Sequence, residues 1–507
     1  MDKMILNVAS IFQNDMILQR NKPVAVWGEA GAKSKVKVTI QGQSVECISD
    51  EKGKWLVNLS DLKASVKEEL IVESGDERIV LTDIAVGEVW LAGGQSNMEF
   101  YMYYDKDYES VLPLCNDQLI RFYDVPKVAS DEHKARFSYD LFGKWRKADE
   151  ENLKYFSAVA YYFAKSLKDD LNVPIGIIGC NWGGSRAACW MDKQTVEKYG
   201  SVWLQDYEKG LLEIKDMDSE REAYFSSDLS DPMKVFDDEI RNKLLRGVPE
   251  EELLRIVAQW QENGNGPVIG PWHEWRPTCL YEYMIKTIVP FSIKGVIYYQ
   301  GESDENHPDI YENMLEGLVG CWRKAFNQDI PFIMTMLAPF EGGGENYVVL
   351  RSQQKLATQR ISNLWCASIG DVGNSYDIHP KEKRPVGKRL ALLARGHVYN
   401  EDVLCDAPVG KALSFDENRL IIECENVDGG LFTKGDSLNG LRVFDELNNE
   451  IDKSTYKTLI ENNKVEITFD KSIKGKKCRV EYAQAPYYEV NIYNMAEIPM
   501  LPFVLEI

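Results

Sequence analysis

Between Ile84 and about Tyr399, short apolar runs alternate with segments of helical spacing, and this alternation constrains the fold more than any other feature of the chain. The apolar runs are Ile84–Ala92, Pro174–Gly179, Gly295–Tyr299, Pro331–Leu337 and Leu364–Ile369. Between the first two runs, Phe156, Val159 and Phe163 keep the spacing of one helix face. Strands that are joined by helices lie parallel, because the helix returns the chain to the same end of the sheet. The pattern therefore predicts an α/β domain whose parallel sheet is covered by helices on both faces.

Alternation by two residues replaces this pattern at both ends of the chain. Apolar residues occupy every second position from Val36 to Ile40 near the start, and from Leu420 to Cys424 toward the end. Such alternation is typical of antiparallel strands with one buried face. We therefore predict an N-terminal β-domain over residues 1–84, an α/β domain over 85–400 and a C-terminal β-segment over 401–507. The last segment is either a second β-domain or the completion of the first.

The charge of the chain argues against several classes of partner. The 507 residues carry a formal net charge of -21, whereas binding to nucleic acid requires clustered Lys and Arg. Acidity also argues against an anionic membrane surface, and the chain has no run of about 18 apolar residues that could span a bilayer. A highly charged segment, about Trp203 to Glu262, interrupts the α/β pattern and is predicted to be a helical insertion. Nothing in the sequence defines an oligomeric state.

The cysteines and the N-terminus favour a cytoplasmic protein. The ten cysteines are scattered and form no CxxC pair, and several, such as Cys180 and Cys366, lie inside apolar runs. This usage is typical of buried free thiols in a reducing compartment. The segment Met1–Asn7 has no basic region followed by a long apolar stretch, so it is not a secretory signal as it stands. A chain from which a signal peptide had been removed would have the same features.

A glycine-rich loop follows the first apolar run of the α/β pattern. It consists of Gly93-Gly94-Gln95-Ser96-Asn97-Met98. A serine at this point exposes its hydroxyl group and its own backbone N–H, and a nucleophile in acyl transfer needs both. The alternative interpretation is a turn of small residues with a solvated serine, which is common in proteins.

Two further loops follow predicted strands in the same way. They are Asn181-Trp182-Gly183-Gly184-Ser185 and Gln300-Gly301-Glu302-Ser303-Asp304. In an open parallel sheet, ligands bind at the carboxyl ends of the strands. A glycine N–H and a glutamine amide that are both directed at one point beside Ser96 would form an oxyanion hole. A tight bend explains a glycine at such a turn equally well, but three such loops together favour a catalytic site.

A serine nucleophile also needs a base, and the chain has five histidines. His133 lies in a polar run and is predicted at the surface; His397 falls on helical apolar spacing and is predicted to pack. His273 lies in an aromatic-rich stretch that either lines a sugar site or packs. In the two remaining cases, Asp377-Ile378-His379 and Glu305-Asn306-His307, an acid lies two residues before the histidine. In either segment the carboxylate could orient the imidazole. Alternatively, either segment is a polar loop before a helix that begins with proline. Spacing alone does not decide which of the two histidines is the base.

The motifs together resemble those of the sialate O-acetylesterase-like family of carbohydrate esterases, within the SGNH (GDSL-type) hydrolase superfamily. The segments that carry the resemblance are Phe12–Arg20, Val26–Gly28, Gly87–Glu99, Trp182–Ser185, Tyr299–Ser303, Asp377–Lys381, Val386–Ala391, Tyr493–Met495 and Pro502–Phe503. They extend over nearly the whole chain. The resemblance implies an SGNH-type, three-layer α/β/α core with a parallel sheet, flanked by N-terminal and C-terminal β-domains.

Carried over residue by residue, the resemblance implies Ser96 as the nucleophile and His379 as general base and acid. It implies Gly184 and Gln300, together with the N–H of Ser96, as the oxyanion hole. Asp377 is implied as the third member of the triad.

The position of this acid departs from the pattern of the wider superfamily. That superfamily usually places its acid three residues before the histidine, where this chain has Tyr376. His379 therefore has Asp377 or another orienting partner, or it works in a dyad. The candidates for loop or substrate contacts are Glu302, Asn97, Trp182 and His307. Further aromatic residues that either stack on a sugar or pack in the core are Trp190, Trp272, Trp275 and Tyr299.

The resemblance implies an enzyme that removes O-acetyl groups from sugars through a serine acyl-enzyme. Its expected substrate is an O-acetylated sialic acid; the alternatives are acetylated xylan or mannan oligosaccharides, a lipid ester, or no reaction at all in a carbohydrate-binding protein with a relic hydrolase core. No metal or other cofactor is expected, since the sequence has no HExxH, no cysteine–histidine cluster with ligand spacing and no glycine-rich phosphate loop. An ordinary imidazole, with a pKa of ~6.5, predicts that activity falls in mild acid.

Overall fold

The computed structural model describes residues 6–136, 142–227, 239–262, 267–472, 475 and 477–507. The chain divides into two compact units. Unit 1 comprises residues 1–303 and 312–332, and unit 2 comprises residues 304–311 and 333–507. Each unit is described by itself. Within the described ranges, no helix has both the length and the apolar character that a membrane span requires.

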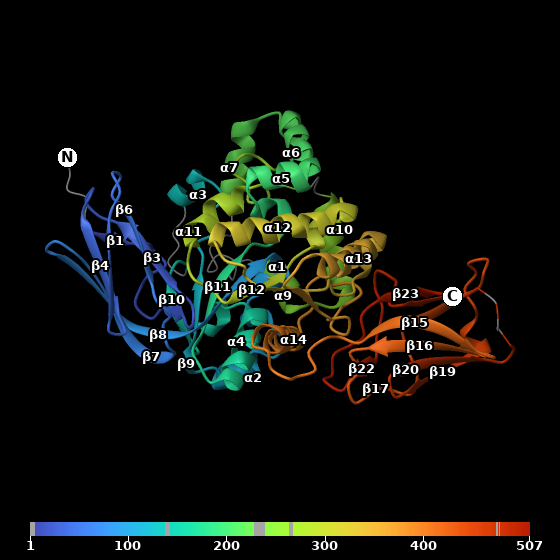
Figure 1. The fold of residues 1–507 in the computed structure, drawn as a ribbon. Helices are drawn as coiled ribbons and strands as arrows, with labels where there is room; N and C mark the ends of the chain where they lie inside the picture. The colour runs from blue at the N-terminus through green and yellow to red at the C-terminus, as the bar shows by residue number, and fades with distance from the viewer. Residues whose placement is uncertain (1–5, 137–141, 228–238, 263–266, 473–474, 476) are drawn as a thin grey trace. The chain divides into compact units, whose positions relative to one another are not determined.

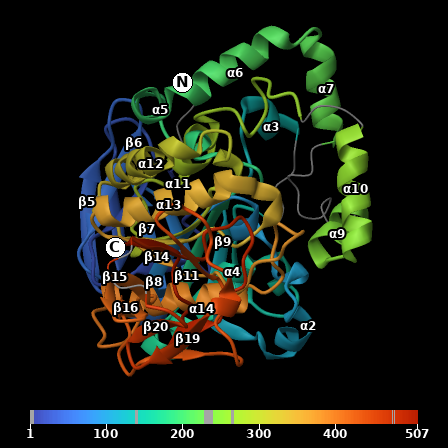
Figure 2. The ribbon, with the colours of Figure 1, turned by 90° about the vertical axis from the view of Figure 1, so that its right-hand side faces the viewer.

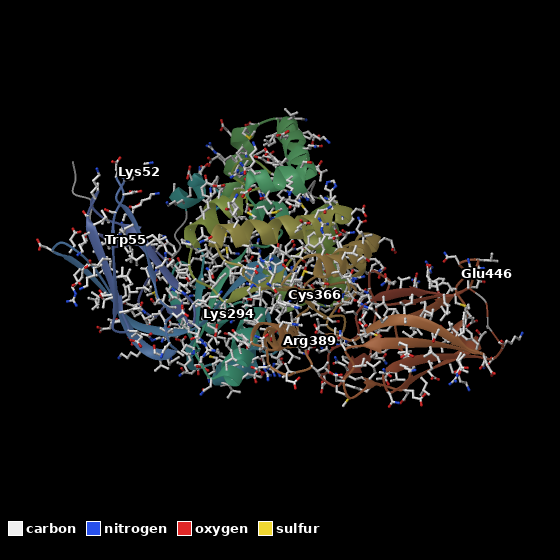
Figure 3. The ribbon with its side chains drawn as sticks, viewed as in Figure 1. Lys52, Trp55, Lys294, Cys366, Arg389 and Glu446 are labelled. Carbon is white, nitrogen blue, oxygen red and sulfur yellow. The ribbon has the colours of Figure 1, made fainter. Side chains whose placement is uncertain are left out.

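The N-terminal part of unit 1 consists of short strands whose side chains alternate between buried and exposed. One sheet has the order β1 (Asn7–Val8), β3 (Val24–Glu29), β6 (Lys54–Leu59). Further pairs join β4 (Lys35–Ile40) to β5 (Gln43–Ile48) and β7 (Ser65–Ser74), and β2 (Ile17–Gln19) to β8 (Glu77–Gly94). In β6, which carries the Trp55 labelled in Figure 3, Trp55, Val57 and Leu59 are buried and the residues between them are exposed. The period of two that predicted these strands follows from this one-sided burial.

Strand β8 connects the N-terminal strands to the central sheet (Figure 1). Its first half pairs with β7 in antiparallel fashion, and its second half lies parallel to two strands of the central sheet. The predicted boundary at residue 84 thus lies inside one continuous strand of 18 residues. Because β8 runs from one sheet into the next without a turn, its sequence contains no local signal that marks a domain boundary.

The central sheet of unit 1 is mixed. Its strands have the order β10 (Trp145–Ala148), β9 (Asp117–Asp124), β11 (Ile175–Asn181), β8, β12 (Gly295–Tyr299). Strand β11 is parallel to β9 and β8, and β12 is parallel to β8. Strand β10, in contrast, is antiparallel to β9. The prediction of a wholly parallel sheet is corrected at this edge, because the chain turns back beside β9 there.

Two helices pack on strands of the central sheet. Helix α4 (Ala158–Leu171) begins where the Ser157 hydroxyl accepts a hydrogen bond from the Ala160 N–H. The Phe163 ring of α4 packs on Trp90 of β8, with ring centroids 5.0 Å apart. Helix α12 (Tyr311–Phe326) packs its Trp322 ring on Tyr298 of β12, at 6.1 Å.

The charged insertion is helical, as predicted, in the part of it that the structure describes. Its helices are α6 (Ser201–Glu213), α7 (Met217–Ser227), α9 (Glu239–Arg246) and α10 (Glu250–Glu262). In Figure 2, α6 lies along the upper border of the view, and α7, α10 and α9 lie along its right-hand side. Residues 228–238 of the predicted insertion lie outside the described residues. The other helices of unit 1 are α1 (Ser96–Glu99), α2 (Tyr108–Val111), α3 (Asp131–Arg136), α5 (Lys193–Tyr199) and α11 (Lys286–Ile288).

Unit 2 joins two βα pairs to a set of antiparallel strands. The first part contains β13 (Phe332–Thr335), α13 (Gly344–Arg360), β14 (Leu364–Ala367) and α14 (Arg384–Leu393). The second part has one sheet of order β15 (Val409–Asp416), β16 (Arg419–Glu425), β20 (Lys464–Phe469), β19 (Tyr456–Glu461). Its smaller sheets are β17 (Leu431–Thr433) with β22 (Ile492–Asn494), and β18 (Leu441–Phe444) with β21 (Arg479–Tyr482) and β23 (Phe503–Glu506). These strands enclose their own apolar core, which includes Leu420, Ile422, Val465 and Ile467.

Candidate active site

Three loops meet at the carboxyl ends of β11, β8 and β12, which are neighbours in the sheet of unit 1. Backbone hydrogen bonds join them beyond the strand ends. The Trp182 N–H donates to the Gly94 carbonyl at 3.1 Å, and the Gln95 N–H donates to the Tyr299 carbonyl at 3.0 Å. The structure thus brings together the three loops that the sequence predicted to meet.

Ser96 is the first residue of α1, directly after the turn that ends β8. Its side chain is partly exposed, whereas the flanking Gln95 and Asn97 are buried. A methyl group placed on Gly183 would lie 3.5 Å from the Ser96 Cβ. The serine therefore lies beside the second loop.

Gln95 and Gln300 link the first loop to the third. The Gln95 Oε1 accepts hydrogen bonds from the Gln300 Nε2 at 3.1 Å and from the backbone N–H groups of Gly301 and Ser303, at 3.4 and 3.2 Å. The Gln300 Nε2 also donates to the Ser185 carbonyl at 3.2 Å, so this one amide contacts all three loops. Its function as an oxyanion donor stays a prediction, and it requires the substrate to replace one of these two acceptors.

Gly184 has the backbone that an oxyanion donor in a tight turn needs. Its φ is 72°, and a Cβ there would lie 2.1 Å from the Trp275 ring, so only glycine fits. Trp275 is held over the loop by a hydrogen bond of 3.0 Å from its Nε1 to the Gly183 carbonyl. Among the residues that the structure describes, none accepts a hydrogen bond from the Gly184 N–H. The amide is thus available to a ligand, as the predicted role requires.

A buried ion pair fixes the second loop to α1. The Glu99 carboxylate accepts a hydrogen bond of 2.6 Å from the Gly183 N–H and forms an ion pair with Lys127, whose side chain is buried. The Lys127 Nζ lies 5.5 Å from the centre of the Trp182 ring. Glu99 stands one helical turn after Ser96, so the nucleophile and the glycine loop are connected to the same short helix.

Asn97 and Glu302 connect α1 to the third loop. Both side chains are buried, and the Asn97 Nδ2 donates a hydrogen bond of 2.6 Å to the Glu302 Oε1. The contact joins the first loop to the third, and the functional roles of the two residues stay predictions. Burial, with the Glu302 charge adding to it, raises the pKa of Tyr299.

Most of the aromatic residues considered as sugar-stacking surfaces are buried. Trp182, Trp190, Trp272 and Tyr299 are each at most 6% exposed and pack in the interior. Trp275 is partly exposed. Of these five residues, only Trp275 therefore offers part of its ring to a ligand in the structure as described.

His133 is fully buried, so its predicted place at the surface is wrong. The rings of Trp182, Tyr224 and Phe225 surround it, with centroids 5.4–5.7 Å away. The Tyr224 hydroxyl lies 2.9 Å from the His133 Nε2 and 2.5 Å from the Glu274 carboxylate. Tyr224 belongs to α7, so a helix of the insertion covers a histidine that its polar sequence neighbours alone would leave in solvent.

In unit 2, Asp377 lies close to the backbone of His379. One carboxylate oxygen accepts a hydrogen bond of 2.8 Å from the His379 N–H, and the other forms an ion pair of 2.8 Å with Lys381. Asp377 thus shapes the loop that carries the histidine. Its predicted contact with the imidazole stays a prediction.

The surroundings of His379 favour its neutral form. Burial lowers its pKa to about 3, and the positive charges of Lys381 and Lys383 act in the same direction. A neutral imidazole is the form that accepts a proton as a general base. The expectation of an ordinary imidazole pKa is corrected here by the local environment.

The other histidines of unit 2 occupy different settings. His307 is partly exposed and directly precedes Pro308, which begins a 3₁₀ turn; its N–H donates to the Asp304 carbonyl at 3.1 Å. His397 stacks on Trp365, with ring centroids 4.7 Å apart and planes at 11°. His397 is therefore a packing histidine, as predicted.

The predicted site residues are distributed over both units. Ser96, Gly184 and Gln300 lie together in unit 1, whereas His379 and Asp377 belong to unit 2. The assignment of His379 as the base for Ser96 stays a prediction.

The sequence indicated no role for Gln95 or Glu99, and for Trp275 it indicated sugar stacking or packing but not the contact with the second loop. Gln95 and Glu99 flank the serine inside the first motif, so their position was visible, but their partners are more than 80 residues away. The place of Trp275 depends on the turn at Gly184. No local signal predicts such contacts.

Comparisons with known proteins find similarity to carbohydrate acetylesterases. A family model described as carbohydrate esterase, sialic acid-specific acetylesterase, matches residues 258–394. Sialate O-acetylesterase of Mus musculus is 27% identical over 434 residues, which cover 78% of this chain and 73% of the relative. The Homo sapiens protein of the same name is 26% identical and covers 78% of this chain and 71% of the relative.

A solved structure of a carbohydrate acetylesterase from Xanthomonas citri extends the similarity to the whole chain. It is 27% identical, covers 98% of this chain and 99% of its own, and superposes with a TM-score of 0.74. The chain is thus similar to sialate O-acetylesterases over 78% of its length and to this carbohydrate acetylesterase over 98%. The chain combines a mixed central sheet with additional β-strand segments.

Proposed function

We propose that this esterase removes O-acetyl groups from sugars by a serine acyl-enzyme mechanism, with O-acetylated sialic acid as its substrate. The observation that carries the proposal is the meeting of three loops around Ser96 at neighbouring strand ends of unit 1. The names of the relatives supply the substrate class, since the mouse and human proteins are sialate O-acetylesterases.

The mechanism assigns one role to each residue. The His379 imidazole takes the proton of the Ser96 hydroxyl group as the serine oxygen attacks the acetyl carbonyl carbon. The N–H groups of Gly184 and Ser96, and the Gln300 amide, stabilise the negative oxygen of the tetrahedral intermediate. The imidazolium returns its proton to the departing sugar oxygen, and water then hydrolyses the acetyl-enzyme by the same route.

Acetate release from a panel of esters tests the reaction and the substrate together. The panel contains O-acetylated sialic acid, an acetylated xylo-oligosaccharide, an acetylated manno-oligosaccharide and a long-chain acyl ester. We expect the fastest release from sialic acid, and Ser96→Ala is expected to lower turnover about a million-fold on every ester. Faster release from the xylan or mannan fragment would show that the substrate is that sugar and not sialic acid. Faster cleavage of the long-chain ester would show that the protein is a lipid esterase. No release from any ester would favour the carbohydrate-binding alternative.

We also infer a three-layer α/β/α core in unit 1. Trp90 and Gly93 of β8 are three positions apart, so their side-chain directions point to opposite faces of the sheet. Phe163 of α4 packs on Trp90, and a methyl group on Gly93 would lie 2.9 Å from Trp322 of α12. These contacts support one helix layer on each face.

We further propose that the protein works in a reducing compartment such as the cytoplasm. All ten cysteines are free thiols, and most of them are buried. Fractionation of the source cells, with immunodetection of the chain, tests this location; recovery in the secreted fraction would contradict it.

A further inference from the structure

Three side chains with different metal-binding atoms converge in unit 2. They are His397, Cys405 and Asp406, and one nitrogen, one sulfur and one oxygen atom from them all lie within 4.8 Å of one another. The His397 Nε2 is 2.9 Å from the Asp406 Oδ1, and the Cys405 Sγ is 4.0 Å from the Asp406 Oδ2. We propose that these three residues bind a divalent transition-metal ion of the Zn²⁺ class.

The backbone around His397 departs from an ordinary helix. Helix α14 continues into a π-helical turn over Ala394–Val398, and His397 lies in this turn. Short π-helical turns inside helices are frequent at functional sites. An ion pair of 2.7 Å between Arg395 and Glu401 then closes the loop that leads toward Cys405. The turn and the ion pair together bring two residues that are eight positions apart to the same point.

Gly396 allows the cysteine to approach this turn. A Cβ at position 396 would lie 2.3 Å from the Cys405 Sγ, which no side chain would tolerate. Cys405 itself is only 7% exposed. The thiol thus occupies a space that exists because residue 396 has no side chain.

Two asparagine amides hold the backbone that presents Asp406. The Asn494 Nδ2 donates to the Asp406 carbonyl and the Asn426 Nδ2 donates to the Ala407 carbonyl, both at 3.0 Å. Asn494 is fully buried. Supports of this kind fix the direction of ligand side chains before an ion arrives, which lowers the cost of binding.

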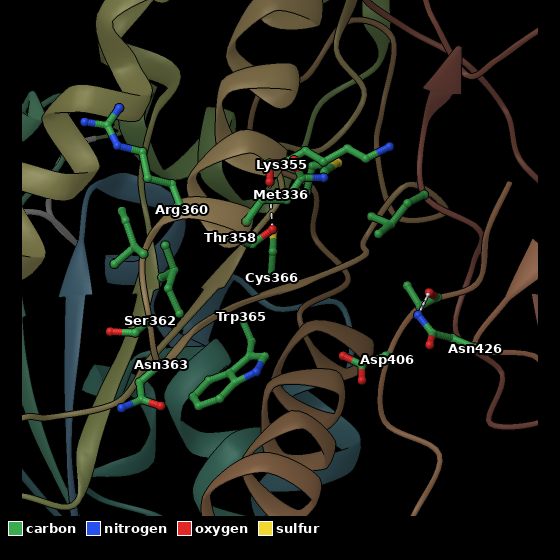
Figure 4. A pocket seen from close by; sticks show the side chains of 15 residues that line it. Met336, Lys355, Thr358, Arg360, Ser362, Asn363, Trp365, Cys366, Asp406 and Asn426 are labelled. Atoms are coloured by element: carbon green, nitrogen blue, oxygen red, sulfur yellow. Dashed lines mark hydrogen bonds between the residues drawn. The ribbon is translucent and has the colours of Figure 1, made fainter. Parts of the chain in front are cut away.

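The third ligand has a fixed ring plane and an open approach. Trp365 stacks on the His397 imidazole at 4.7 Å, so the ring is constrained while its Nε2 faces Asp406. Trp365 and Asp406 also line a pocket of about 480 Å³ (Figure 4). Asp406 is the member of the cluster that lines this pocket, so an ion would approach the three side chains from the side of Asp406.

The donor set selects the class of ion. Imidazole nitrogen, thiolate sulfur and carboxylate oxygen are the ligands of Zn²⁺, and three protein ligands leave a fourth position for water. Mg²⁺ and Ca²⁺ prefer oxygen atoms alone. Cys405–Asp406 lie just before β15 and His397 follows α14, so the ion would connect the helical and β-strand parts of unit 2. It would act as a structural clip and have no step in the ester chemistry.

Spectroscopic titration of the full chain with Co²⁺, which takes the place of Zn²⁺ at such sites, tests the proposal. We expect a thiolate-to-cobalt charge-transfer band that saturates at one equivalent per chain and is abolished in Cys405→Ser. The matched control is Cys366→Ser, because Cys366 is another free cysteine of unit 2 and lines the same pocket (Figures 3 and 4). The control should keep the band.

A second variant protects the test against misfolding of Cys405→Ser. His397→Gln is expected to move the Co²⁺ titration to concentrations at least about tenfold higher, since changes even in residues behind metal ligands have effects of this size. Zn²⁺ at a hundredfold excess over its Kd should raise the Tm of the wild type by about 5–10 °C, and that of His397→Gln by much less. A band that persists in Cys405→Ser, a band lost equally in Cys366→Ser, or no band in the wild type would overturn the proposal.

Discussion

Gln300 links the loops of the site and is proposed to donate a hydrogen bond to the oxyanion. A single substitution distinguishes the oxyanion role from simple packing. Its amide contacts Gln95 and Ser185, and the mechanism asks it also to stabilise the oxyanion. Gln300→Ala is expected to lower kcat on an acetyl ester about a hundred- to a thousandfold, because one preorganised donor is lost. The matched control is Tyr298→Phe, which removes the hydroxyl group that donates to the Gln300 Oε1 at 3.3 Å but leaves the amide hydrogens in place. A loss of less than tenfold in Gln300→Ala would remove this residue from the oxyanion hole.

The pH dependence of activity tests the environment of His379. Since burial and two lysines lower its pKa to about 3, the imidazole stays neutral as the pH falls through 6.5, and the acid limb of kcat/KM should lie below that value. In Lys381→Met one of the two positive charges is gone, so the pKa rises and the limb moves to higher pH. Lys388→Met, at an exposed lysine of α14, should leave the limb unchanged. A wild-type limb at about 6.5, or no shift in Lys381→Met, would contradict this assignment.

Single residues were predictable from the sequence where a motif defined them and not where a distant element did. Ser96 and Gly184 occupy the positions that their glycine-rich loops implied. His133 was placed at the surface because its neighbours in the chain are polar, yet Tyr224 and Phe225 of the insertion bury it. Burial of this kind depends on tertiary partners that the local pattern does not contain.

Among the elements, the turn after β11 requires glycine at position 184, whereas we expect it to tolerate alanine at position 183. In Gly184→Ala the new Cβ meets the Trp275 ring at 2.1 Å and the residue keeps a φ of 72°, so we expect a loss of about 1–3 kcal/mol of unfolding free energy. Activity should fall further, because the oxyanion amide moves. Gly183→Ala is the control: its Cβ finds only ordinary contacts, the nearest at 3.5 Å. Denaturant unfolding curves of the two variants compare them, and equal stabilities would contradict the account.

Strands and helices with a clear period were predicted correctly, since burial on one face is what creates the period. β4, β16 and α4 are examples. β10 was missed because its four residues, Trp145–Ala148, are too few to show alternation, and its direction follows from pairing with β9. The π-helical turn at His397 was missed as well, because its sequence continues the helical spacing of α14.

At the scale of the whole molecule, the rule that ligands bind at carboxyl ends of parallel strands predicted which loops meet. The rule predicted the loops correctly because β11, β8 and β12 are adjacent and parallel. The antiparallel strand β10 lies at the edge of the sheet and does not affect them. The division of the chain was less predictable. Residues 304–311 belong to unit 2, although the segments before and after them belong to unit 1. Strand β8 is continuous across the predicted boundary at residue 84. Long-range contacts decide such divisions, and a linear sequence does not display them.

We propose that Ser96 of unit 1 is a nucleophile and that His379 of unit 2 activates it. The most direct measurement is the rate at which a serine-reactive phosphonate labels the full chain, with the modified residue located by mass spectrometry. We expect one label, at Ser96, its formation abolished in His379→Ala and retained in His307→Ala, the histidine with the same acid spacing. A label on another residue, or a label at Ser96 that forms as fast in His379→Ala as in the wild type, would contradict the account.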